Sequence, residues 1–152
     1  MSNYNVFYKC IVRSVNHIFK NFFKDELIDE VFDTQASKSD PVVSVELSGA
    51  LKGEIIINLP IRTLNLIVKQ LMPDVKPQAI KKYHADVAGE IANMITGTFA
   101  NQLQYINYNV RLSAPDFNED PITIKALYDN INVSFQSSYG GFDVDLYYKE
   151  SY

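Results

Sequence analysis

The longest helical pattern of the chain runs from about residue 77 to residue 106, and it limits the possible folds more than any other feature. Successive residues of an α-helix lie about 100° apart, and this spacing gathers the apolar side chains of the segment in one broad arc. The arc consists of Val87, Ala88, Ile91, Ala92, Met94, Ile95, Phe99 and Leu103. We expect it to face the core, because a helix with so wide an apolar face must bury it.

The opposite side of the same helix is a narrow polar stripe of unusual composition. It consists of Asp86, Glu90, Asn93, Gly97, Ala100, Asn101 and Gln104. Exposed helix faces are usually rich in Lys, Arg and Glu, yet no Lys or Arg occurs between Lys82 and Arg111. Gly89 and Gly97 occur where glycine costs a helix up to about 1 kcal/mol relative to alanine. The stripe is therefore either a solvated face or a docking surface whose small side chains let another backbone approach.

The remaining patterns predict two further helices and several strands. Helical spacing recurs in residues 4–22, and again in residues 61–72 between two prolines. Strands are expected at 42–48, 52–58, 131–136 and 142–148, with weaker signals within 28–35 and at 122–126. The segments 131–136 and 142–148 are expected to form an antiparallel hairpin. The predicted fold is α+β, one domain over residues 1–152, in which a mostly antiparallel sheet packs in two layers with three helices.

Composition excludes several classes of protein. The hydrophobic fraction of 47% suffices for a core, and the net charge of -4 argues against a nucleic-acid binder. The single Cys10 allows no internal disulfide and no thiolate metal cluster, which fits a reducing compartment. His17 and His84 have no carboxylate or Cys at ligand spacing, so we expect no metal site, and we expect His84 at the surface. With no membrane-spanning stretch and no secretory pattern, the expectation is a cytoplasmic protein.

Three segments of the chain resemble one protein family. The segment DVAGEIANMITG, with Asp86, Glu90 and Asn93, resembles the D/S-x-x-x-E-x-x-N signature of the CheC/CheX chemotaxis phosphatases. LSGALKGEIIINLP resembles the strand pair that precedes the signature in that family, and IRTLNLIVKQLM resembles the intervening helix. The first predicted helix has no acid where CheC and flagellar-switch members carry a second site, so the CheX type is the better match. After Gln104 the usual continuation of the family is hard to trace.

This resemblance implies a function and a site. Such proteins hydrolyse the aspartyl phosphate of CheY-like response regulators, with the signature helix as the active site. The resemblance implies that Glu90 pairs with the active-site lysine of the regulator and that Asn93 positions the attacking water. Asp86, Gly89, Gly97, Ala100 and Asn101 are expected to contact the partner. The Mg²⁺ ion belongs to the regulator in this scheme, so no cofactor of its own is expected.

The residue types suit that chemistry. Phosphoryl transfer needs mainly in-line positioning of the nucleophile and neutralised charge. An amide both donates and accepts hydrogen bonds, whereas a carboxylate beside the phosphoryl group would repel it. The alternative is a receiver-binding or adaptor protein of the same fold without turnover.

The resemblance to the CheX type also implies a homodimer. The alternating segments 131–136 and 142–148 could leave a sheet edge that is able to pair with a second copy. The other possibilities are that these strands are internal, or that Asp143 and Asp145 guard the edge.

Overall fold

The computed structural model describes residues 3–118 and 128–150. The helices are α1 (Tyr4–Asn21), α2 (Ile61–Leu71), the 3-10 helix η1 (Pro77–Tyr83) and α3 (His84–Tyr105). The strands are β1 (Asp29–Val31), β2 (Val42–Gly49), β3 (Leu51–Asn58), β4 (Val110–Leu112), β5 (Asp116–Asn118), β6 (Asp129–Ser137) and β7 (Gly140–Glu150). None of the helices within these ranges has the length and apolar character that a membrane span requires.

The strands form one seven-stranded sheet with the order β1-β6-β7-β3-β2-β4. Every pair in it is antiparallel, and β5 joins β2 beside β4, so that β4 pairs with residues 47–49 and β5 with residues 42–44. The long central strands β3 and β7 pair over eight residues, from Leu51 opposite Glu150 to Asn58 opposite Asp143. The sheet and its three α-helices confirm the predicted α+β class.

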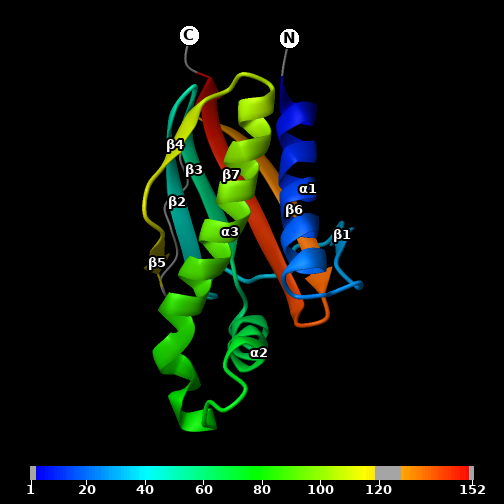
Figure 1. Ribbon diagram of the computed structural model, residues 1–152, viewed down its shortest axis with the longest axis vertical. Helices are drawn as coiled ribbons and strands as arrows, with labels where there is room; N and C mark the ends of the chain where they lie inside the picture. Colours follow the sequence, from blue (N-terminus) through cyan, green and yellow to red (C-terminus); the bar gives the residue numbers. More distant parts are fainter. Residues whose placement is uncertain (1–2, 119–127, 151–152) are drawn as a thin grey trace.

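α1 and α3 lie side by side across one face of the sheet, and α2 lies at the end of the sheet where α3 begins (Figure 1). Alternate residues of the strands, such as Ile55, Ile57 and Leu146, are at most 2% exposed and form one core with the helices. The helices contribute Phe7 and Phe19 of α1 and the predicted arc of α3. Within that arc every residue is buried except Met94, which is half-buried. The predicted core face of the long helix is therefore confirmed.

The face of the sheet turned away from the helices is polar and carries a buried carboxylate. Asp143 is fully buried and accepts hydrogen bonds from the hydroxyl of Ser134 at 2.6 Å and the backbone N–H groups of Gln35 at 3.0 Å and Ala36 at 2.8 Å. A buried carboxylate needs such donors, because an unpaired one would carry a large desolvation cost. Asp143 thereby ties the segment after β1 to the middle of the sheet.

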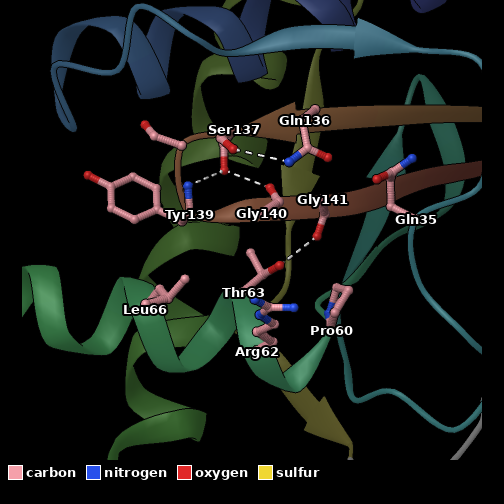
Figure 2. A pocket seen from close by; sticks show the side chains of 11 residues that line it. Gln35, Pro60, Arg62, Thr63, Leu66, Gln136, Ser137, Tyr139, Gly140 and Gly141 are labelled. Atoms are coloured by element: carbon pink, nitrogen blue, oxygen red, sulfur yellow. Dashed lines mark hydrogen bonds between the residues drawn. The ribbon is translucent and has the colours of Figure 1, made fainter.

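The turn between β6 and β7 packs directly against the first turn of α2 (Figure 2). The Thr63 hydroxyl donates to the carbonyl oxygen of Gly141 at 2.8 Å. Gly140 has φ +123°, and a Cβ atom there would lie 2.5 Å from the Thr63 oxygen. Both facts require glycine at this position. The contact fixes α2, which packs in turn against α3.

Four sequence-based expectations need correction or are left open. The long helix does not begin at residue 77, because residues 77–83 form η1 and α3 begins at His84. His84 is buried, and its Nε2 lies 2.6 Å from Oδ1 of Asn65, so it is no surface residue. β7 lies inside the sheet, but β1 covers β6 only at residues 134–136, so the suggested free edge is limited to residues 129–133 of β6. The expected strand at 122–126 lies outside the described residues.

We predict that Gly140→Ala lowers the free energy of unfolding by about 1–3 kcal/mol, because it forces a strained φ and a clash with Thr63. The matched control is Gly97→Ala in α3, where a Cβ would meet no atom within 4 Å. The control should gain about 0.5–1 kcal/mol, because alanine is the better helix former. Urea unfolding of both variants measures the difference, and equal stabilities would contradict this assignment.

Candidate functional site

The stripe of α3 lies on the surface, as its spacing predicted. Asp86, Glu90, Asn93 and Asn101 are exposed. Gly89, Gly97 and Ala100 are half-buried on the same helix. Glu90 and Asn93 are three residues apart, which places them on neighbouring turns about 4.5 Å apart along the helix axis. All seven predicted site residues are thus brought together on one helix.

The two polar groups in the middle of the stripe are unengaged. Among the described residues, neither Glu90 nor Asn93 has a hydrogen bond or an ion pair. The stability of the fold therefore does not depend on either side chain. A carboxylate and an amide that the fold itself does not use are available to a partner.

The two glycines have no packing role that would explain them. A Cβ at Gly97 would meet nothing within 4 Å, and one at Gly89 would lie 3.5 Å from Cγ of Pro115, an ordinary van der Waals distance. Both positions thus accept the helical cost of glycine without an internal reason. Gly97, which belongs to the stripe, leaves room for close approach by another molecule, whereas Gly89 lies beside the stripe and faces Pro115.

Hydroxyl groups hold the helix backbone on both sides of Asn93. Thr96 donates to the carbonyl of Ala92 at 2.7 Å, and Thr98 donates to that of Met94 at 2.9 Å. Such bonds to the carbonyl four residues earlier often bend a helix slightly. Thr96 is also only 1% exposed. The carbonyls on both sides of Asn93 therefore each accept a second donor, one from a buried threonine and one from a half-buried threonine.

The short strands β4 and β5, which lie next to α3, were not predicted from the sequence. After α3, the backbone N–H of Tyr108 donates to the carbonyl of Leu103 at 2.9 Å, and the chain reverses into β4 and β5. Both strands contact α3, and Pro115 between them lies next to Gly89. Three residues are too few to show an alternation of apolar and polar side chains, so the sequence gives no signal for these two strands.

Other groups that could carry chemistry lie away from the stripe. Asp145 is on the face of the sheet turned away from α3, and burial raises its pKa, although amide groups of Asn132 and Asn130 donate to it. A cleft of about 480 Å³ lies between α2 and the β6–β7 turn, where Arg62 and Tyr139 line it (Figure 2). This cleft contains none of the predicted site residues.

Cys10 is buried on α1. Burial raises the pKa of the Cys10 thiol, which makes the reactive thiolate scarce. Among residues 3–118 and 128–150 no group of three or more His, Cys, Asp and Glu side chains is arranged to hold a metal ion. His17 lies on the exposed side of α1, next to the amide of Asn21.

Comparison with known proteins points to one family. The family model described as chemotaxis phosphatase CheX matches residues 41–127, which is more than half of the chain. No curated protein matches the sequence.

Solved structures share the fold at low sequence identity. CheX from Desulfovibrio desulfuricans is 20% identical with a TM-score of 0.76, covering 95% of this chain and 99% of that one. Chemotaxis protein CheX from Vibrio vulnificus is 20% identical with a TM-score of 0.77, covering 94% and 96%. The CheX-CheY-BeF3-Mg²⁺ complex from Borrelia burgdorferi matches with 18% identity and a TM-score of 0.78, covering 95% and 98%.

Proposed function

Since the chain belongs to the CheX family of chemotaxis phosphatases, we propose that it hydrolyses the aspartyl phosphate of a CheY-like response regulator. The observation that carries the proposal is the exposed stripe of α3, where Glu90 and Asn93 have no partner within the described chain. A protein of this fold is found in complex with CheY in the Borrelia burgdorferi structure, which supports a CheY-like partner.

In the proposed reaction Glu90 provides the anchor. Its carboxylate pairs with the active-site lysine of the regulator, and no cation of the stripe competes for it. A pair of opposite charges at a desolvated interface fixes the register of two proteins. Because α3 is a rigid helix packed on the core, this pair also sets the position of the next turn.

Asn93 then acts on the attacking water. The amide oxygen accepts a hydrogen bond from the water and holds it in line with the phosphorus–oxygen bond that breaks. The water oxygen forms the new bond to phosphorus, the aspartate of the regulator leaves as a carboxylate, and inorganic phosphate is released. Mg²⁺ on the regulator supplies charge neutralisation in this proposal, and this chain supplies position.

We predict that Asn93→Ala lowers turnover by about 10²–10³, because it removes one preorganised polar group of the transition state. Affinity for the phosphorylated regulator should change little, since the anchor is intact. Phosphate release at saturating regulator measures turnover. Asn5→Ala, which removes an exposed amide from α1, is the matched control and should be fully active. Wild-type turnover in Asn93→Ala would refute the catalytic role.

Glu90→Ala should act mainly through binding. Truncating one partner of an interfacial charge pair can cost about 2–5 kcal/mol of binding free energy. The loss of activity should therefore shrink as the regulator concentration rises towards saturation. Initial rates over a range of phosphorylated regulator test this, with the exposed Glu26→Ala as a control for the lost charge. An unchanged concentration dependence in Glu90→Ala would contradict an anchoring role.

The same assays separate the phosphatase from the adaptor. An adaptor of this fold would bind the phosphorylated regulator through the stripe without accelerating phosphate release. If the wild-type protein binds but leaves the regulator's own rate of phosphate loss unchanged, the adaptor is correct and the phosphatase is wrong.

We also propose that the protein is a homodimer. Among the described residues, the edges of the sheet are β1 and residues 129–133 of β6 on one side, and β4 and β5 on the other. Leu27 and Phe32 flank β1 and are 71% and 103% exposed, so a second copy that pairs with β1 would cover them. Light scattering at micromolar concentration should give twice the 17.3 kDa chain mass. Phe32→Ser should weaken the dimer, and a monomer mass for the wild type would contradict the proposal.

A further inference from the structure

α1 and the last turns of α3 cross the sheet next to each other (Figure 1). Side chains of both segments line a groove between them. It has a volume of about 320 Å³. Its apolar lining comes from Val6, Cys10, Tyr105 and Ile106, and its charged lining from Lys9 and Arg13. This surface is hereafter called the α1–α3 groove. We propose that it binds an acidic amphipathic helix of a partner protein, a proposal independent of the phosphatase function.

The apolar side chains of the groove are exposed enough to indicate that another molecule packs on them. Tyr105 is 90% exposed, and Val6 and Ile106 are about 40% exposed. Val6 is on α1, Tyr105 is the last residue of α3 and Ile106 follows it, so segments far apart in sequence are adjacent in space here. Single exposed apolar residues are ordinary, but a hollow lined by several of them is typical of binding surfaces.

The charges beside the groove all have one sign. α1 has no Asp or Glu, and its exposed charged positions are Lys9, Arg13 and Lys20, with His17 between them. None of these four residues has a carboxylate partner within the described chain. Lys9 and Arg13 are one turn apart, so they form a short cationic row along the groove. In a protein of net charge -4, this is a local reversal that favours an acidic ligand.

The walls of the groove favour a helix over an extended peptide. Both walls are α-helices, whose backbone groups already bond within the helix. The carbonyl of Cys10, at the groove, is also 3.3 Å from the Gln102 amide. An extended peptide would find few backbone partners there and would leave its own polar groups unpaired. A helix satisfies its backbone internally and offers apolar and acidic side chains at matching spacing.

A second copy of this chain does not fit the groove. In a symmetric pair the same surface faces itself, so Lys9 and Arg13 would meet their own copies. Like charges brought face to face oppose association. The groove is separated from Glu90 along the axis of α3, because Gln102 and Tyr105 lie 12 and 15 residues beyond it, about 18–22 Å further along the helix. An acidic helix in the groove thus leaves Glu90 and Asn93 uncovered.

The test uses the full-length protein and two labelled helical peptides of about 15 residues. Both carry Leu at positions i, i+3, i+4 and i+7 in an alanine-rich background, and one has Glu and the other Lys along one flank. Fluorescence anisotropy should show binding of the Glu peptide and at least tenfold weaker binding of the Lys peptide. Amide NMR shifts caused by the Glu peptide should map to residues 6–13 and 102–106. Equal binding of both peptides, or shifts elsewhere, would overturn the proposal.

Charge variants separate the groove from net charge. Lys9→Glu with Arg13→Glu should weaken binding of the Glu peptide about tenfold, because two cation–carboxylate contacts become repulsive. Lys38→Glu with Lys76→Glu makes the same change in net charge on exposed positions outside the groove and should leave affinity within about twofold. If both double variants lost the same affinity for the Glu peptide, net charge alone would explain the effect, and the proposed site would be refuted.

Two further measurements test other occupants. Val6→Glu adds an acid to the groove near the start of α1, where an acidic side chain is tolerated. This variant should also bind the Glu peptide more weakly. Vesicles of phosphatidylserine should not compete with the Glu peptide, and Lys9→Glu with Arg13→Glu should not change the mass of the protein by light scattering. Competition by vesicles would assign the groove to a membrane surface, and a change in mass would assign it to self-association. Either result would contradict the proposal.

Discussion

The packing of one face of α3 against the sheet and α1 is the interaction on which the rest of the structure depends. Ile91, Ile95 and Phe99 are each 1% exposed or less, and they sit in the same core as the inward residues of the strands. A rotation of α3 by a single residue, about 100°, would move Glu90 towards the core and bring apolar side chains to the surface. Burying an unpaired carboxylate costs several kcal/mol, so the core sets the rotation of the helix. The outward direction of Glu90 and Asn93 follows from that packing.

The elements with strong periodicity could be predicted from the sequence. The arc of α3 is nearly continuous over five turns, and β2, β3, β6 and β7 each have eight or more residues, long enough for a readable pattern. The features that depend on remote partners could not be predicted. His84 is buried because Asn65, on another helix, accommodates its ring nitrogen, and nothing near it in sequence signals this. The coverage of residues 134–136 of β6 likewise depends on their pairing with β1, about a hundred residues earlier.

The candidate site divides in the same way. Helical angles alone place Glu90 and Asn93 together on an outer face, but they do not distinguish a solvated face from a docking surface. The structure adds the unengaged state of both groups and the empty space beside Gly97. The cationic row of α1 is present in the sequence at a spacing of four residues, but a search for adjacent basic residues overlooks it. It becomes visible only where helix α1 places Lys9 and Arg13 beside the same groove.

The distribution of charge over α1 and α3 has a consequence for recognition. α3 presents acids and amides and no Lys or Arg, whereas α1 presents cations and no acids. A partner group of positive charge is therefore attracted to the stripe and repelled by α1, and an acidic partner experiences the opposite preference. Repulsion between like charges disfavours the docking of either partner on the wrong surface, and attraction favours its docking on the right one. Two adjacent helices on one sheet can in this way offer surfaces of different specificity, and neither surface requires a change in the core that supports both.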